Sequence, residues 1–298
     1  MPIESMSRRA FLAAGGGALL LAACGGSSSN SGAKTTANGF NKKGLSAFRM
    51  EIEPYASDSP QRFAFILTKN DGNIFGGPAA ALSIAPPGGG SFGPAMPATY
   101  HAEGLPPHRG VYVVDLVARA PGNWRGRVKI AGQPDAELAF PVSANPDTPM
   151  IGEMAPVVPS PTVTSTMGVN PLCTRTNAAN KPAPCAFHQT SLDQVIGKGK
   201  PVIAMFATPA RCQSRYCGPV LDQLIAVAPT YGDAITPIHV EIYQDLTSNN
   251  LITATETWLG TTGEPWIFAV DGTGKVTGRL SGAFATDEIK TLIDNVVA

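Results

Sequence analysis

Charged residues are scarce in this sequence of 298 residues. It contains 22 Lys and Arg against 22 Asp and Glu, which gives a formal net charge of zero. It has no basic patch and no interleaving of basic with aromatic residues, so we expect no nucleic-acid partner. A second long apolar run is also missing, and only the run near the N-terminus is a candidate for membrane contact.

The N-terminus is typical of an export signal. Arg8 and Arg9 come first, an apolar run covers residues 10–23, and Cys24 follows directly. The run is too short to span a bilayer comfortably. The stretch around the two arginines resembles the twin-arginine export motif, and the four residues that end at Cys24 resemble a lipobox. This resemblance implies that the mature chain begins at Cys24, whose thiol carries a lipid with acyl chains such as palmitate.

Residues 46–145 show short alternating apolar runs separated by Gly and Pro, a pattern typical of antiparallel strands. We predict an all-β sandwich. The segments 110–113 and 121–124 resemble the small immunoglobulin-like domains of some bacterial envelope proteins. His101 and His108 are expected in Pro-rich loops, and Met96 with His101 is a possible copper pair. The predicted strands are 47–52, 62–68, 80–84, 110–118, 124–130 and 136–142.

A Pro-rich connection, residues 146–190, carries Cys173 and Cys185. Four cysteines besides Cys24 in an exported chain favour disulfides over free thiols. A bond between Cys173 and Cys185 would close a loop of about a dozen residues and remove roughly 3 kcal/mol of unfolded-state entropy. We therefore predict a structural disulfide. The alternative is that this pair, together with His188, accepts electrons from the second cysteine pair or binds a metal.

From residue 200 onwards, apolar runs alternate with segments of helical periodicity, which predicts parallel strands joined by crossover helices. The predicted order of elements is βαβαββα. Cysteines lie between the first strand and the first helix, and Gly263-Glu264-Pro265 precedes a later strand. In these features the last hundred residues resemble the thioredoxin superfamily. The resemblance implies that Pro265 is a cis-proline facing the pair Cys212 and Cys217.

The cysteine spacing departs from this family. Four residues separate Cys212 from Cys217, where the family usually has two. Cys217 is expected just before a helix N-terminus, whose partial positive charge favours a thiolate. Arg211 and Arg215 are expected to act in the same direction. The resemblance thus implies thiol-disulfide exchange by this pair, and the alternative is a purely structural disulfide.

Two other families share parts of this pattern. Copper chaperones of cytochrome oxidase assembly have a thioredoxin fold, two cysteines in a loop and a distant His, which here would give Cys212, Cys217 and His239 as copper ligands. The segment 206–209 ahead of Cys212 resembles a peroxiredoxin loop, with Thr208 one residue too far from the cysteine. A non-catalytic protein, in which the β domain binds an envelope partner, is a third alternative.

Taken together, these patterns predict a membrane-anchored thiol-disulfide oxidoreductase on the extracytoplasmic face of the cell membrane. Its partners would be exported proteins with thiols or disulfides, and it would need no cofactor unless the copper alternative holds. The oligomeric state and the direction of exchange are not predicted. The expected organisation is a signal peptide (1–23), a flexible tether (24–45), a β-sandwich domain (46–145), a Pro-rich connection (146–190) and a thioredoxin-like domain (191–298).

Overall fold

The structure is a computed structural model that describes residues 44–298. The predicted signal peptide, the lipid site at Cys24 and nearly all of the predicted tether lie outside the described residues. Within residues 44–298, no helix is both long enough and apolar enough to cross a membrane.

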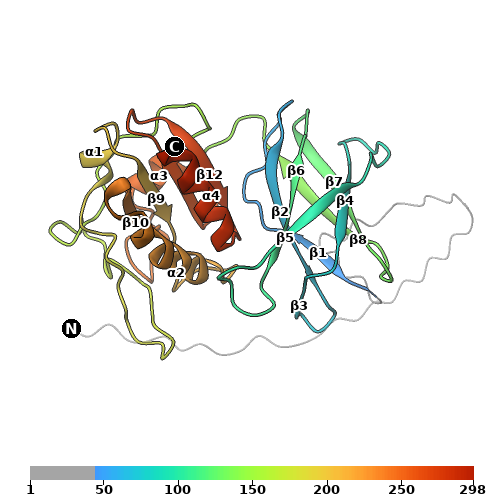
Figure 1. The fold of residues 1–298 in the computed structure, drawn as a ribbon, viewed down its shortest axis with the longest axis horizontal. Coiled ribbons are helices and arrows are strands. Elements are labelled where there is room, and N and C mark those ends of the chain that lie inside the picture. Colours follow the sequence, from blue (N-terminus) through green and yellow to red (C-terminus); the bar gives the residue numbers. More distant parts are fainter. Residues whose placement is uncertain (1–43) are drawn as a thin grey trace, which may run out of the picture. The chain divides into compact units, whose positions relative to one another are not determined.

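The first part of the described chain is an antiparallel sheet (Figure 1). Its strands alternate between buried and exposed residues: in β7, Trp124 and Val128 point into a core while Arg125 and Lys129 face solvent. Six strands overlap the six predicted runs. The strands are β1 (Ser46–Arg49), β2 (Gln61–Thr68), β3 (Ile74–Phe75), β4 (Ala80–Ala85), β5 (Met96–His101), β6 (Val111–Leu116), β7 (Gly122–Ile130) and β8 (Ala136–Val142).

The predicted sandwich of two separate sheets is not confirmed. The strand order is β1-β2-β6-β5-β4-β7-β8, with β3 paired to β2, and β5 joins the two halves because it pairs with both β4 and β6. The end strands β1 and β8 lie in contact, so the sheet curls toward closure around one core.

The expectation that His101 lies in a loop is wrong, because it ends strand β5. Its Nδ1 lies 2.6 Å from an Asp287 carboxylate oxygen. Met96 begins the same strand and packs against the core of the first sheet. Residues five apart on a strand point to opposite faces, so Met96 and His101 do not form a copper pair.

From β9 onwards the second part of the described chain follows the predicted βαβαββα order, and the short helix α1 precedes it. The strand order of the second sheet is β10-β9-β11-β12, in which β10 runs parallel to β9 while β11 and β12 are antiparallel neighbours. This is the strand arrangement of the thioredoxin fold. The elements are α1 (Leu192–Val195), β9 (Val202–Phe206), α2 (Cys217–Val227), β10 (Thr236–Val240), α3 (Thr253–Leu259), β11 (Trp266–Val270), β12 (Val276–Ser281) and α4 (Thr286–Val297), with a 3-10 segment at Ala228–Ala234.

Both faces of this second sheet are covered, as expected for a central strand that is apolar throughout. In β9, Ile203 and Met205 belong to the core formed with α2 and α4, whereas Ala204 and Phe206 belong to the core that contains Trp258 of α3. Figure 1 shows α2 and α4 side by side over the sheet. The site residues discussed below lie near the ends of β9 and β11 and at the outer edge of β10.

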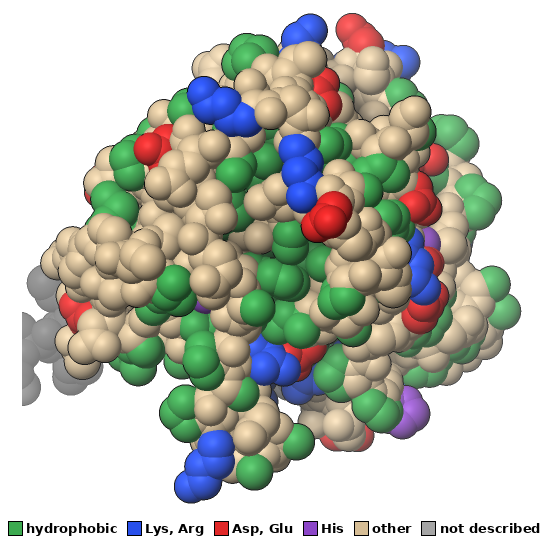
Figure 2. Space-filling view, turned by 60° about the vertical axis from the view of Figure 1, so that its left-hand side comes forward, with side chains coloured by type: hydrophobic (Ala, Val, Ile, Leu, Met, Phe, Trp, Pro, Cys, Tyr) green, Lys and Arg blue, Asp and Glu red, His purple; other side chains and the backbone are tan. Residues whose placement is uncertain are grey.

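The two sheets share buried contacts. Ala64 of β2 and Val111 of β6 belong to the same apolar cluster as Cys217. The Arg62 side chain, also on β2, forms ion pairs with Glu51 at 2.8 Å and with Glu288 of α4 at 2.7 Å. In Figure 2, Lys and Arg side chains lie scattered among Asp, Glu and uncharged residues, with no continuous patch of one charge on that face of the described chain.

Candidate active site and a second cysteine cluster

Cys212 and Cys217 form a disulfide, with their Cα atoms 5.9 Å apart. Cys217 is the first residue of α2, and Cys212 lies in the loop before it. The backbone N–H of Cys217 also donates to the Cys212 sulfur at 3.2 Å. Cys217 is fully buried, whereas Cys212 is partly exposed. The sulfur of Cys212 is therefore the one that a partner molecule can reach more easily.

The loop between the two cysteines is shaped by its own residues. Arg215 has a φ of 62°, in the left-handed region, and the chain turns there into α2. Tyr216 is buried and its hydroxyl donates to the Arg109 carbonyl at 3.1 Å. Pro219 lies in the first turn of α2, where a missing N–H costs no helical hydrogen bond. Together these features place Cys217 at the helix N-terminus.

The two arginines near the pair have other contacts. The Arg211 guanidinium donates to the carbonyls of Asp245 and Ser248 and to the Asn249 side chain, and it lies 4.0 Å from the centre of the Tyr243 ring. Arg215 is exposed, and its carbonyl accepts from the Arg109 guanidinium. None of these contacts involves a cysteine sulfur. Stabilisation of a cysteine thiolate by Arg211 and Arg215 therefore stays a prediction.

Pro265 lies at the same end of the sheet as the disulfide. Trp266 pairs with Phe206, so Pro265 comes just before β11 at the point where β9 ends and leads to the cysteine loop. The Glu264–Pro265 peptide bond is cis, the isomer that the resemblance implies. The Glu264 carboxylate accepts a hydrogen bond from the Thr208 backbone N–H, and burial raises the pKa of this carboxyl to about 7.

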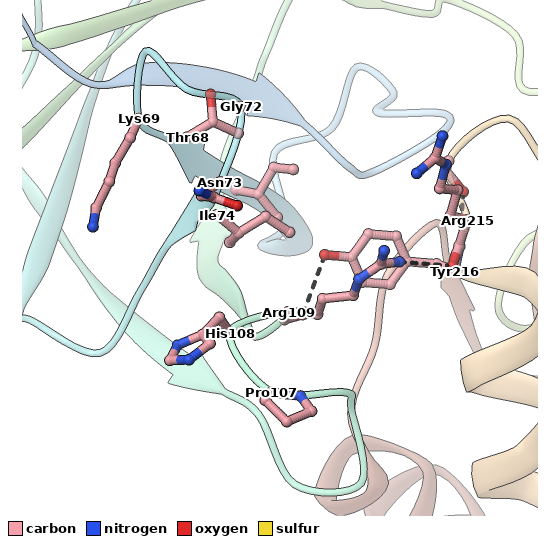
Figure 3. Close-up of a pocket in the computed structure, with 12 residues that line it drawn as sticks. Thr68, Lys69, Gly72, Asn73, Ile74, Pro107, His108, Arg109, Arg215 and Tyr216 are labelled. Carbon is pink, nitrogen blue, oxygen red and sulfur yellow. Dashed lines mark hydrogen bonds between the residues drawn. The ribbon is translucent and has the colours of Figure 1, made fainter. Parts of the chain in front are cut away.

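A cavity of about 650 Å³ adjoins the cysteine loop (Figure 3). One wall comes from the cysteine loop and includes Ser214 and Tyr216, and the opposite wall comes from β2 and β3. Figure 3 shows Arg109 between them, with its carbonyl bonded to the Tyr216 hydroxyl and its guanidinium bonded to the Arg215 carbonyl. Ser214 also lines cavities of about 550 and 450 Å³. The cysteine loop thus borders three cavities.

A second cluster consists of Cys173, Cys185, His188 and His239. The two sulfurs lie 4.0 Å apart, and His239 Nδ1 lies 3.7 Å from the Cys173 sulfur and 3.4 Å from the Cys185 sulfur. His188 Nε2 lies 3.1 Å from the same Nδ1. All four ligand atoms fall within 4.8 Å of one another. Only Cys185 is partly exposed; the other three residues are buried.

The edge strand β10 holds this cluster together. His239 lies on β10, and its backbone N–H donates to the Phe187 carbonyl, which fixes the segment that carries Cys185 and His188. Glu241, just after β10, accepts from both the backbone N–H and the hydroxyl of Thr174, the residue next to Cys173. The Pro-rich connection therefore covers the open edge of β10, which would otherwise present unpaired backbone groups.

The electrostatics of the cluster favour one thiolate. Because the two thiols share a hydrogen bond, the pKa of Cys173 is lowered and the pKa of Cys185 is raised. Burial lowers the pKa of His188, which favours its neutral form. Burial also raises the pKa of the Glu241 carboxyl to about 7. The pKa of His239 is raised, because burial, which lowers it, is outweighed by the hydrogen bond to Cys173 and by the charges of Glu241 and Cys173. The cluster thus combines a thiolate with a neutral His188 ring, the forms in which cysteine and histidine bind metals.

Two sequence-based expectations change with this geometry. Cys173 and Cys185 are free cysteines here, so the predicted structural disulfide is not formed in this structure. His239 contacts this cysteine pair and not Cys212 or Cys217, so the alternative copper set is not brought together. The alternative in which His188 acts together with Cys173 and Cys185 fits the geometry, because the ligand atoms of the three residues lie within 4.8 Å of one another. No sequence signal links His188 to His239, about fifty residues further along.

No protein-family model and no curated protein matches this chain. Among solved structures, a thiol:disulfide interchange protein DsbE from Chlorobium tepidum is similar at 15% identity and a TM-score of 0.35, covering 51% of this chain and 100% of that chain. A thioredoxin family protein from Chlorobium tepidum TLS has 20% identity and a TM-score of 0.32, covering 53% and 100%. A conjugative transposon lipoprotein from Bacteroides eggerthii has 15% identity and a TM-score of 0.18, covering 33% and 96%. Because these TM-scores are low, the assignment of the thioredoxin fold depends on the strand order of the chain itself.

Proposed function

We propose that the chain is a thiol-disulfide oxidoreductase whose exchanging pair is Cys212 and Cys217. The proposal depends on the different exposure of the two sulfurs of this disulfide: Cys212 is partly exposed, while Cys217 is buried at the N-terminus of α2. A thiolate at that position is stabilised by the unpaired N–H groups of the first helical turn. Cys217 is therefore the better leaving group and Cys212 is the sulfur to be attacked.

In the oxidative direction, a thiolate of a substrate dithiol attacks the Cys212 sulfur. The Cys212–Cys217 bond breaks, and Cys217 leaves as a thiolate. The second substrate thiol, once deprotonated, then attacks the substrate sulfur that is bonded to Cys212. This attack forms the substrate disulfide and releases Cys212 as a thiolate. Two electrons pass from the substrate to the protein pair, and the substrate thiol protons pass to water or to the released thiolates.

The reductive direction reverses these steps. The Cys212 thiolate attacks a substrate disulfide and forms a mixed disulfide, which Cys217 then resolves as the Cys212–Cys217 bond re-forms. Both directions pass through a mixed disulfide on Cys212. The Ser214 hydroxyl lies 3.3 Å from the Cys212 sulfur, and the three cavities that Ser214 lines give room for a substrate chain near the cysteine loop.

Single-cysteine variants test this proposal. We expect Cys217→Ser to accumulate a mixed disulfide with a dithiol or disulfide peptide, because the resolving sulfur is missing. Cys212→Ser should accumulate far less, since its remaining sulfur is fully buried. The measurement is intact mass under non-reducing conditions, followed by peptide mapping to place the adduct on Cys212.

The two variants serve as matched controls, because each removes one sulfur of the same bond. Equal trapping in both would contradict the assigned roles. A Cys212–Cys217 bond that dithiothreitol fails to open in the native protein would favour the purely structural alternative and end the enzymatic proposal.

We also propose that the chain is exported through the segment around Arg8 and Arg9 and anchored at Cys24 by its lipid. The sequence pattern alone supports this, since these residues lie outside the described part. In that location, the substrates would be exported proteins with thiols or disulfides. The immunoglobulin-like character of the first sheet likewise stays a prediction.

A further inference from the structure

The second cysteine cluster has the dimensions of a tetrahedral metal site. Bonds of about 2.3 Å from Zn²⁺ to sulfur and 2.0–2.1 Å to nitrogen imply ligand separations of about 3.8 Å between two sulfurs, 3.6 Å between sulfur and nitrogen, and 3.3 Å between two nitrogens. In the structure, four of the six separations are 4.0 Å between the sulfurs, 3.4 and 3.7 Å from His239 to them, and 3.1 Å between His239 and His188. These four lie within a few tenths of an ångström of the tetrahedral values, and the two separations from His188 to the sulfurs are at most 4.8 Å.

Hydrogen bonding alone does not account for this arrangement. His239 Nε2 lies 2.9 Å from the Ala207 carbonyl, which can only accept, so Nε2 carries the proton. Nδ1 then has one lone pair in the neutral ring or one proton in the charged ring, and Cys173, Cys185 and His188 all lie within 3.7 Å of it. Either form makes one good hydrogen bond, whereas the lone pair of the neutral ring can bind a cation that the other three residues also bind. A carbonyl that fixes the outer nitrogen of a histidine is also the usual support of a metal ligand.

We propose that Cys173, Cys185, His188 and His239 bind one Zn²⁺ ion in a closed tetrahedral site. Two thiolates and two neutral imidazoles match the ligands of structural zinc. The charge of the ion balances that of the two thiolates, which would be costly to bury uncompensated. Four protein ligands leave no open position, so the ion fastens the Pro-rich connection to β10 and takes no part in exchange at Cys212 and Cys217.

Metal analysis and cobalt spectroscopy test the site in the full chain. We expect the protein, purified in detergent under reducing conditions, to contain one zinc per chain. Co²⁺ added to the metal-free protein should produce thiolate-to-cobalt charge-transfer bands and the d–d bands of tetrahedral coordination, and Zn²⁺ should abolish them. Removing zinc with a chelator should lower the midpoint of thermal unfolding.

Variants separate this site from the exchange pair. Loss of a residue that only hydrogen-bonds to a metal ligand weakens metal binding by roughly 10-fold or more. Cys185→Ser and His188→Asn each remove a ligand itself, so each should weaken cobalt binding by more than roughly 10-fold. The double variant Cys212→Ser/Cys217→Ser should keep one zinc per chain, so failure of the metal site and failure of the exchange proposal are distinguishable. Circular dichroism of the metal-free variants checks that they are folded.

Three results would overturn the proposal. The first is a reduced chain that binds neither Zn²⁺ nor Co²⁺, with a Cys173–Cys185 disulfide as its stable form. The second is binding of Cu⁺ without binding of Zn²⁺ or Co²⁺. The third is cobalt affinity that does not change in either Cys185→Ser or His188→Asn.

Discussion

At the scale of single residues, four cysteines of one chain have two different chemistries because their neighbours differ. Cys217 lies at a helix N-terminus and is bonded to Cys212 in the loop before that helix. Cys173 and Cys185 face two imidazole rings and stay unbonded to each other. A sulfur beside helix N–H groups is suited to leave and return as a thiolate, whereas two sulfurs beside imidazole nitrogens are suited to share a cation.

Glu264 gives the fold a predicted pH dependence. Burial raises the pKa of its carboxyl from an ordinary value of 4.5 to about 7. The folded state therefore keeps a proton between these pH values that the unfolded state releases, so this residue's contribution to stability is fully present below pH 4.5 and is lost as pH rises through 7. Glu264→Gln keeps an acceptor for the Thr208 N–H and cannot ionise.

We expect Glu264→Gln to gain stability relative to the original chain as pH rises from about 4.5 to about 7, by up to about 3 kcal/mol. Urea unfolding at several pH values measures this difference. Parallel stability curves for the two proteins over that range would mean that Glu264 is ionised throughout in the folded state.

At the scale of elements, the local pattern of apolar and polar residues was enough to predict a strand where these residues alternate regularly or where the strand is apolar throughout. Strands β7 and β8 were predicted within a few residues of their observed bounds. Strand β5 was missed, because Pro97 lies inside it and a proline has no N–H to donate to a ladder. Its place between β4 and β6 depends on neighbours distant in sequence, which no local pattern reveals.

The turn between β12 and α4 provides an element-scale prediction. Gly282 has a φ of 68°, and a Cβ atom there would overlap the backbone carbonyl of Met50. We expect Gly282→Ala to destabilise the fold by about 3 kcal/mol or more, because the backbone on both sides must shift.

Gly132→Ala, in the turn between β7 and β8, is the matched control for Gly282→Ala. Gly132 has a φ of 74° and no atom within 4 Å of an added Cβ, so its substitution should cost only about 1–2 kcal/mol of backbone strain. Chemical unfolding of both variants measures the two costs. Equal losses would show that the contact with Met50 adds nothing to the strain.

At the scale of the whole molecule, the two sheets are joined by buried apolar contacts and by Arg62. Its guanidinium pairs with Glu51 and with Glu288 of α4, and it donates to the Ala283 carbonyl at 2.6 Å. All three charged side chains are at most 14% exposed. Removal of the arginine would leave two buried carboxylates without their ion-pair partner.

We expect Arg62→Leu to destabilise the protein by about 3–5 kcal/mol, the cost of breaking a buried ion pair. Arg119→Leu is the control: it removes an exposed pair with Asp58, in which both side chains are more than 70% exposed, and should cost about 0–1 kcal/mol. Thermal and urea unfolding of both variants provide the comparison. Similar small losses would show that Arg62 does not hold the sheets together.

The sequence by itself determined the βαβαββα order and the positions of Cys212 and Cys217 between the first strand and first helix of that order, because hydrophobic periodicity and helix-start residues are local signals. Only the tertiary structure decided that Cys173 and Cys185 meet His188 and His239 and do not form a disulfide with each other. His239 meets Cys173, Cys185 and His188 because the Pro-rich connection folds back onto the edge of β10. That packing joins residues up to 66 positions apart, and such distant contacts leave no trace in local pattern or spacing.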